Sequence, residues 1–136
     1  MPTVYELKTD TKRIADIQKA TLETTDYGIE PTNGLFGSKE WWAAIDSGSL
    51  PIHTLSGKIR RVYMGSMNDW PEVEIVDGEG TLSRWTREVN NQGSDAEYRP
   101  GRNIEIDYVL QRNRPASWDR GTETKCVLAV RINDVA

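Results

Sequence analysis

The sequence predicts a mainly β protein with two short helices near its N-terminus. Several segments in the last two thirds of the chain alternate between apolar and polar residues, which is typical of strands with one buried face. Glycine, proline, asparagine and aspartate separate these segments at short intervals. Helical spacing of apolar residues occurs only before residue 50. We therefore expect a five- to six-stranded antiparallel sheet that forms a small barrel or a curled sheet.

The N-terminal segment contains one strand and one helix. Residues 3–7 read as a short strand, and Asp10 is placed to cap a helix over Thr11–Leu22. Three side chains share one face of that helix, namely Ile14, Ile17 and Thr21. Residues 24–37 are rich in turn-forming residues and read as an irregular connection.

The second helix has clear start and stop signals. Ser38 can cap a helix that begins at Lys39, and Gly48 can end it. Trp41, Trp42 and Ile45 cluster on one face, so at least one tryptophan should pack inward. We expect this helix to seal the open end or a face of the sheet.

The middle of the chain reads as a long strand followed by a hairpin. Residues 52–64 form the long strand, which we expect to bend at Gly57. In Glu72–Val76, Val73 and Ile75 should point inward and Glu72 and Glu74 outward. Residues 77–80, with the sequence DGEG, predict a hairpin turn of the Asp-Gly type, and Thr81–Glu88 is the return strand.

Two strands with strong alternation complete the prediction. Residues 89–101 read as a loop by composition, and Asn103–Leu110 and Lys125–Ile132 as strands. In the first of these strands, one face should carry Ile104, Ile106, Tyr108 and Leu110, and the other Glu105 and Asp107. In the second, the inward residues should be Cys126, Leu128, Val130 and Ile132.

The order of these segments over residues 52–132 resembles an OB-like barrel. A long bent strand, a hairpin and a Pro-Gly turn before a strongly alternating strand carry the resemblance. The chain departs from that pattern at residues 89–101, where OB-like barrels commonly place a helix, so an SH3-like or other meander barrel stays open. We expect one domain over residues 1–136, with residues 1–50 packing as a helical and irregular segment on a β-barrel of residues 51–136.

Composition limits the classes of function. A chain of 136 residues is the usual length of one domain. Its net charge of −4 lacks the basic excess of a nonspecific nucleic-acid binder. No apolar run is long enough for a membrane span, and the N-terminus lacks a secretory signal pattern. A single cysteine excludes an internal disulfide, so we expect a reducing, cytoplasmic location.

The candidate catalytic residues form no known constellation. His53 is the only histidine, which is too few for a histidine-based zinc site, and its place in a strand favours a structural or surface role. Cys126 alternates with core residues, so we expect an inert thiol. Two carboxylate pairs, Glu72 with Glu74 and Glu105 with Asp107, fit a solvated outer face better than acid–base chemistry. We expect no metal and no cofactor.

The best candidate surface is aromatic and basic. Trp70 precedes Pro71 in a polar loop, which favours an extended backbone and an exposed ring. Exposed tryptophan near arginine is typical of binding surfaces. The candidate surface consists of Trp70, Asp69, Trp85, Arg84, Arg87 and Arg60. In the alternative interpretation, Trp70 folds back on the barrel and the arginines pair with Glu72, Glu74 and Glu88.

These observations favour a small nonenzymatic binding module. Its exposed tryptophan and arginine residues would engage a protein partner rather than single-stranded nucleic acid, since the total charge is acidic. Two alternatives stay open. One is a homo-oligomeric assembly component that uses the Trp41-Trp42 helix or an open strand edge. The other is a small enzyme with carboxylate acid–base chemistry assisted by His53 or Asp69.

Overall fold

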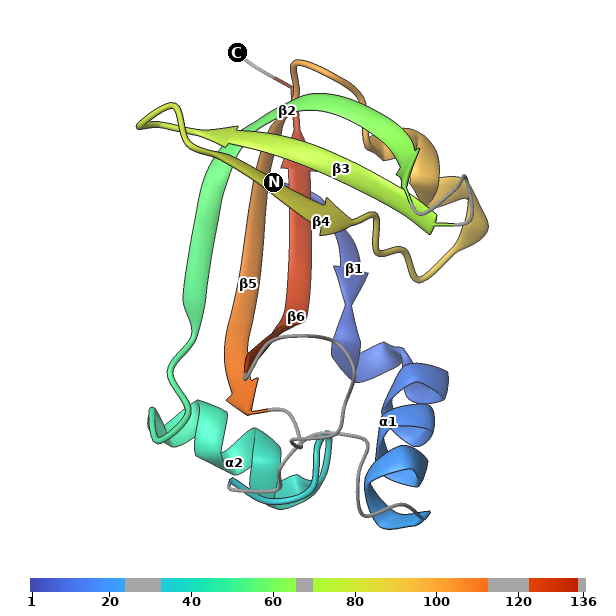
Figure 1. Cartoon of the computed structure of the whole chain (residues 1–136), viewed down its shortest axis with the longest axis vertical. Helices are drawn as coiled ribbons and strands as arrows, with labels where there is room; N and C mark the ends of the chain where they lie inside the picture. Colours follow the sequence, from blue (N-terminus) through green and yellow to red (C-terminus); the bar gives the residue numbers. More distant parts are fainter. Residues whose placement is uncertain (24–32, 66–69, 113–122, 135–136) are drawn as a thin grey trace. The chain divides into compact units, whose positions relative to one another are not determined.

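Six antiparallel strands form one curled sheet in the order β1-β6-β5-β2-β3-β4 (Figure 1). The computed structural model describes residues 1–23, 33–65, 70–112 and 123–134. The strands are β1 (Thr3–Glu6), β2 (His53–Gly65), β3 (Trp70–Asp77), β4 (Leu82–Thr86), β5 (Asn103–Arg112) and β6 (Glu123–Asn133). In the described part of the chain β1 and β4 are the edges of the sheet. The mainly β prediction is therefore confirmed as a curled sheet, and the barrel is not closed.

Both predicted helices are present, as α1 (Thr11–Glu23) and α2 (Lys39–Ser47). The described residues also contain two short 3₁₀ helices, η1 (Leu7–Thr9) before α1 and η2 (Gln92–Glu97) between β4 and β5. The prediction that residues 89–101 form only a loop is therefore wrong, because η2 lies within them. None of the described helices is long and apolar enough to cross a bilayer.

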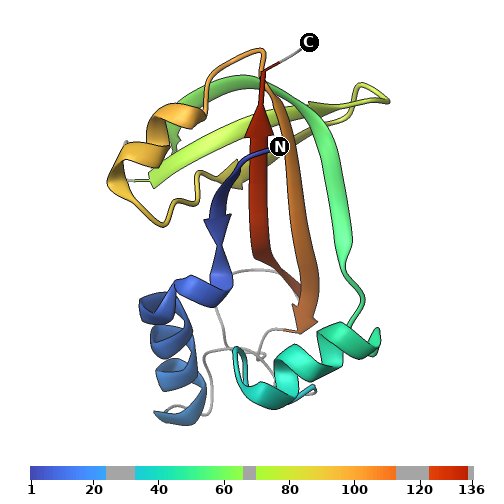
Figure 2. The same cartoon turned by 180° about the vertical axis from the view of Figure 1, so that it is seen from behind.

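The contacts divide the chain into two compact units. The first contains Met1–Glu6, Thr54–Asp107 and Ala129–Ala136, and the second Leu7–His53 and Tyr108–Leu128. Figure 2 shows, from behind, the strands β1, β6, β5 and β2 running side by side. Our prediction of a single domain with residues 1–50 packed on the rest stays a prediction.

The first unit is built around the inward faces of its strands. Val73 and Ile75 of β3 are fully buried, as predicted. In β6, Val130 and Ile132 of this unit are buried, as are Cys126 and Leu128 of the second unit, so the predicted alternation continues without a break along the strand. Burial of each such aliphatic side chain stabilises the folded state by about 1.5–3 kcal/mol relative to leaving it exposed. The buried residues of this unit include Val4, Tyr5, Ile59, Trp85, Tyr98, Ile104, Ile106, Val130 and Ile132.

Strand β2 runs unbroken through Gly57 but approaches β3 very closely there. A Cβ atom at residue 57 would lie 2.4 Å from the carbonyl oxygen of Val76, so only glycine fits without a backbone shift. The change of register occurs further on, between Ile59 and Arg61. The irregularity of β2 is therefore a bulge at Arg60, and Gly57 is the point of closest approach.

The β3–β4 hairpin is confirmed, but its turn differs from the predicted one. Strand β3 ends at Asp77 and β4 begins at Leu82, and the positive φ of +84° belongs to Gly80. The Asp77 carboxylate accepts hydrogen bonds from the backbone N–H groups of Glu79 (2.9 Å) and Thr81 (3.0 Å). This longer Asx-type loop replaces the two-residue Asp-Gly turn because Asp77 can satisfy two turn amides at once.

The two helices of the second unit begin at their predicted caps. The backbone N–H of Arg13 donates to Asp10 Oδ1 (3.2 Å), and that of Trp41 donates to Ser38 Oγ (3.2 Å). Gly48 ends α2 with a φ of +84°.

A buried hydrogen bond joins α2 to β5 within the second unit. The Trp41 ring is fully buried, and its Nε1 donates to Oε1 of Gln111 (3.0 Å). Val109 and Gln111 are the buried residues of this part of β5, whereas Tyr108 and Leu110 are half-buried. Tyr108 and Leu110 are therefore less buried than Ile104 and Ile106, with which the predicted alternation groups them, and Trp41 packs against the face of β5 that carries Gln111.

We expect Gly57→Ala to lower the free energy of unfolding by about 1–3 kcal/mol, the usual cost of overpacking. The added methyl group would displace the β3 backbone at Val76. Urea unfolding followed by tryptophan fluorescence measures the change. Gly78→Ala is the matched control, since a Cβ atom there meets nothing within 4 Å and φ is not positive. Equal stability of the two variants would contradict the close approach.

Candidate protein-binding site

Three arginines surround one buried carboxylate on the outer face of β2, β3 and β4. Glu74 is only 3% exposed and binds Arg60, Arg61 (Nε–Oε1, 3.3 Å) and Arg84 (Nε–Oε2, 3.5 Å). The arginine side chains themselves are 56%, 49% and 66% exposed. We call these four residues the arginine cluster. The prediction that Glu74 is solvated on the outer face is therefore wrong, because the arginines cover it.

The register of the strands explains how the arginine cluster forms. On β4, Arg84 pairs directly with Glu74 across the β3–β4 ladder. On β2, Ile59 pairs with Ile75 and Arg61 with Glu74, so the extra residue Arg60 lies in a bulge. The bulge presents two consecutive arginines to one carboxylate, which regular alternation cannot do.

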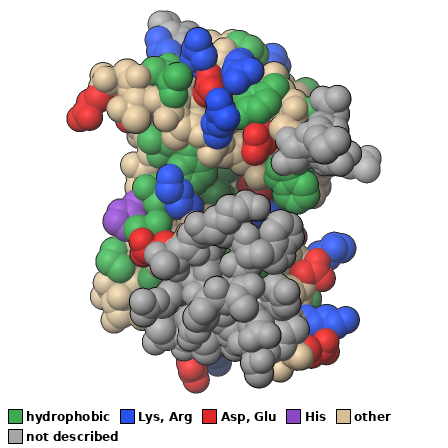
Figure 3. Space-filling view, in the orientation of Figure 1, with side chains coloured by type: hydrophobic (Ala, Val, Ile, Leu, Met, Phe, Trp, Pro, Cys, Tyr) green, Lys and Arg blue, Asp and Glu red, His purple; other side chains and the backbone are tan. Residues whose placement is uncertain are grey.

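The arginine cluster carries three positive charges and one negative charge. Hydrogen bonds from Arg60 and Arg61 hold the pKa of Glu74 below its ordinary value of 4.5. The carboxylate therefore stays ionised at neutral pH and orders the guanidinium groups. Arg61 also lies over the ring of Tyr63, with 4.3 Å from Cζ to the ring centroid. Figure 3 shows lysine and arginine side chains gathered over this part of the sheet.

Trp70 lies on the same face of β3 as the arginine cluster. Residues two apart on a strand share a face, so Trp70, Glu72 and Glu74 point the same way. Trp70 is 48% exposed, and its ring Nε1 donates to Oγ1 of Thr86 (2.8 Å). At about 3.3 Å per residue, Trp70 and Glu74 are about 13 Å apart along the strand. This is a surface ring held in place by β4.

Two predicted surface residues belong to the interior of the first unit instead. Trp85 is only 7% exposed and donates to Ser83 Oγ (2.9 Å), because it alternates to the face opposite Arg84. The Arg87 side chain is 11% exposed and binds the Tyr63 carbonyl (3.2 Å) and the Asp95 carboxylate (3.4 Å). Trp85 and Arg87 are therefore not part of the exposed surface on which the sequence analysis placed them. Asp69 lies outside the described residues.

The arrangement therefore brings together Arg60, Arg84 and Trp70 of the predicted surface and adds Arg61. The alternative interpretation, in which the arginines pair with Glu74, is confirmed for Arg60, Arg61 and Arg84. Regular strand alternation did not reveal that Arg60 and Arg61 both reach the same carboxylate. A signal was present, since the imperfect alternation around Arg60-Arg61 marks a bulge, and a bulge places neighbouring side chains on one face.

The other predicted carboxylate pair, Glu105 with Asp107, is bound by one arginine. Arg131 binds Asp107 through two nitrogens (2.8 and 2.9 Å) and Glu105 through Nε (3.0 Å). Thr54 donates a further hydrogen bond to Asp107 (2.8 Å). These bonds, led by Arg131, lower the pKa of Asp107. A carboxylate held in its ionised form is poorly suited to shuttle protons near neutral pH.

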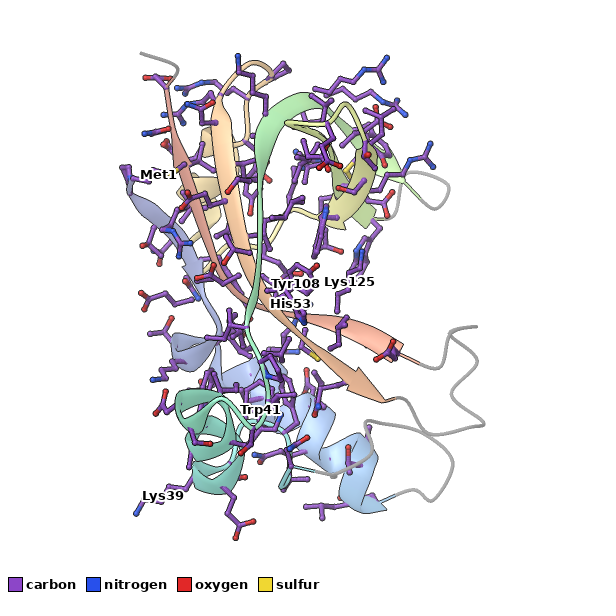
Figure 4. The ribbon with its side chains drawn as sticks, turned by 90° about the vertical axis from the view of Figure 1, so that its left-hand side faces the viewer. Met1, Lys39, Trp41, His53, Tyr108 and Lys125 are labelled. Atoms are coloured by element: carbon purple, nitrogen blue, oxygen red, sulfur yellow. The ribbon has the colours of Figure 1, made fainter. Side chains whose placement is uncertain are left out.

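The remaining candidates for catalysis are also engaged in structure. In the second unit the exposed His53 ring stacks on Tyr108, with 5.4 Å between centroids, and Lys125 lies 5.9 Å from the Tyr108 ring (Figure 4). Burial raises the pKa of the Cys126 thiol to about 12, so the reactive thiolate is not formed at neutral pH.

The first unit also has an open hollow of about 460 Å³, and its lining includes two carboxylates, Asp77 and Glu105. The Asp77 carboxylate binds turn amides, and Glu105 binds Arg131. Within the described residues, no group of three His, Cys, Asp or Glu side chains is placed to hold a metal ion.

We expect the stabilisation from Glu74 to be lost in acid. Its pKa is lowered by folding, so the ionised form contributes stability above about pH 4.5 and loses it as the pH falls through the lowered value. Urea unfolding of the wild type and Glu74→Gln measures this directly. The wild type should be clearly more stable at pH 7, and the difference should shrink between about pH 5 and pH 3. A difference that does not change with pH would contradict the ionised, arginine-bound Glu74.

Comparison with known proteins identifies the family. No curated protein matches the chain. The sequence model of one family, described as Immunity protein RhsI2, matches residues 1–133. The match supports a small module that binds a protein partner. Because the match spans nearly the whole sequence, the chain belongs to the RhsI2 immunity protein family.

Proposed function

We propose that this protein neutralises a toxin by binding it through the outer face of β2, β3 and β4. The contact surface consists of Trp70 and the three arginines of the arginine cluster, and we call it the Trp–Arg surface. The family supplies the class of function, since an immunity protein acts on its cognate toxin. One observation carries the choice of surface: a fixed, half-exposed tryptophan shares one face of β3 with three exposed arginines.

Tryptophan and arginine are the residue types that most often dominate the energy of protein interfaces. Trp70 offers a large apolar ring that is already anchored by its hydrogen bond to Thr86. An anchored ring loses little conformational freedom on binding, and ordering a flexible side chain costs about 0.5–1.5 kcal/mol. Trp70 is therefore placed to fill an apolar hollow on the toxin.

The arginines are ordered in the same way by Glu74. Because the carboxylate holds three guanidinium groups, their positions are set before the partner arrives. Their outer nitrogens remain able to donate to carboxylates, which arginine binds with favourable forked geometry. The charge of the arginine cluster is opposite in sign to the net charge of the chain, which is −4. The matching surface of the toxin should therefore be acidic.

Neutralisation through this surface needs no chemistry. A bound protein that covers a toxin's functional surface blocks it sterically, and complementary charge speeds the encounter. Salt should then weaken the association, because exposed charges are screened.

We expect Trp70→Ala and Arg60→Ala each to weaken toxin binding at least tenfold, which corresponds to about 1.4 kcal/mol or more. Isothermal titration with an inactive variant of the cognate toxin measures the affinity. Arg99→Ala is the matched control for Arg60→Ala, because the two side chains are 55% and 56% exposed and both substitutions remove one positive charge. Leu22→Ala is the control for loss of an exposed apolar side chain, since Leu22 is 71% exposed on α1.

Both controls should bind the toxin within about twofold of the wild type. Wild-type affinity in Trp70→Ala and Arg60→Ala would remove the Trp–Arg surface from the proposal. Absence of any association between the wild type and the toxin would contradict the proposed function as a whole.

A further inference from the structure

Strand β4 ends the sheet and has an outward edge. The phase of its hydrogen-bond ladder with β3 follows from two bonds, Arg87 N to Pro71 O (3.1 Å) and Asp77 N to Thr81 O (3.0 Å). The register between them is regular, so Ser83 and Trp85 also face β3. The backbone N–H and C=O groups of Leu82, Arg84 and Thr86 therefore point away from the sheet.

Those outward groups have no hydrogen-bond partner among the residues that the structure describes. Each of the three residues contributes one donor and one acceptor. Together they form a row about 13 Å long, at about 3.3 Å per residue. Such a row is a template for another extended chain.

At the opposite edge of the sheet, formed by β1, a side chain binds backbone groups of the strand. At the end of β1, the side chain of Asn90 accepts a hydrogen bond from the Glu6 N–H (2.7 Å) and donates one to the Glu6 carbonyl (3.1 Å). The amide of Asn90 thus occupies the position that a neighbouring strand would take. On β4 the Trp70 side chain binds the Thr86 hydroxyl, and among the described residues no side chain binds the outward backbone groups of Leu82, Arg84 and Thr86.

We propose that β4 is a docking edge that takes up an extended, acidic segment of the toxin as a further strand. This inference rests on the proposed function and specifies how the partner is held. Main-chain hydrogen bonds to Leu82, Arg84 and Thr86 would align the segment, and Arg84 would select its charge. Arg84 belongs to both the edge and the arginine cluster, so the docked strand is continuous with the Trp–Arg surface.

Charge decides between a toxin segment and a second copy of the chain. In a symmetric antiparallel pairing of β4 with itself about its centre, Arg84 stands opposite Arg84 of the other copy, and directly opposed like charges are destabilising. The arginines of β2 add positive charge on the same face. A carboxylate opposite Arg84 has the complementary charge, with cross-strand Cβ atoms about 4.5–5.5 Å apart.

Residue-level hydrogen–deuterium exchange by NMR tests the proposal on the wild-type protein. In the free protein the amides of Ser83 and Trp85 should exchange slowly, and those of Leu82, Arg84 and Thr86 quickly. On addition of the inactive toxin variant, the three fast amides should slow at least tenfold. Binding of the toxin with unchanged exchange at all three would overturn the docking edge but leave the proposed function intact.

A pair of substitutions at one position separates main chain from side chain. Arg84→Ala removes the guanidinium, and Arg84→Pro removes in addition the outward N–H, while the inward bonds of the neighbouring residues to β3 remain. We expect Arg84→Pro to bind the toxin at least tenfold more weakly than Arg84→Ala. Far-ultraviolet circular dichroism and thermal unfolding establish whether Arg84→Pro is folded. If this variant does not fold, the hydrogen–deuterium exchange experiment on the wild-type protein still tests the proposal.

Three further outcomes have defined meanings. Equal affinity of folded Arg84→Pro and Arg84→Ala would overturn the proposal. Protection of Leu82, Arg84 and Thr86 that rises with protein concentration in the absence of toxin would also overturn it, because a second copy would then occupy the edge. Failure of the wild type to bind the toxin would instead contradict the proposed function on which the docking edge depends.

Discussion

The interaction on which the binding face depends is the buried carboxylate of Glu74 beneath three arginines. A charged side chain that is 3% exposed must be paired and hydrogen-bonded, since an isolated buried charge is strongly unfavourable. The arginines meet that requirement from two neighbouring strands, β2 and β4. The same contacts fix three flexible cations at defined places on the surface. The pairing that the buried Glu74 needs in the folded protein therefore also preorganises the arginines on the outer face of β2, β3 and β4.

The geometry of the sheet makes this arrangement possible. Strand β3 lies between β2 and β4, so one of its residues can reach partners on both sides. Because of the bulge at Arg60, β2 contributes two arginines to Glu74 instead of one. The exposed Trp70 lies on the same face. Strand β4 contributes Arg84, the acceptor for Trp70 and the outward edge. The proposed interface therefore comes from one hairpin and the strand beside it.

Local patterns predicted most of the secondary structure but not the environment of single charged residues. The alternation of β6 and the caps of α1 and α2 are local, and all of them are confirmed. The burial of Glu74 depends on register across three strands and on a bulge, neither of which the alternation of β3 alone reveals. In β5 the buried set changes because Trp41, seventy residues away, bonds to Gln111. The sequence neighbours of Trp85 and Arg87 favour a surface position, whereas alternation along β4 buries Trp85 and a contact with Asp95 covers Arg87.

The most direct test of this account is a titration of the labelled protein with the inactive toxin variant, followed by NMR. The indole N–H of Trp70 and the Nε–H groups of Arg60, Arg61 and Arg84 are the signals to follow. The account predicts that these signals shift together and saturate at one equivalent of toxin. Saturation of binding with these four signals unmoved, and shifts confined to residues elsewhere in the chain, would contradict it.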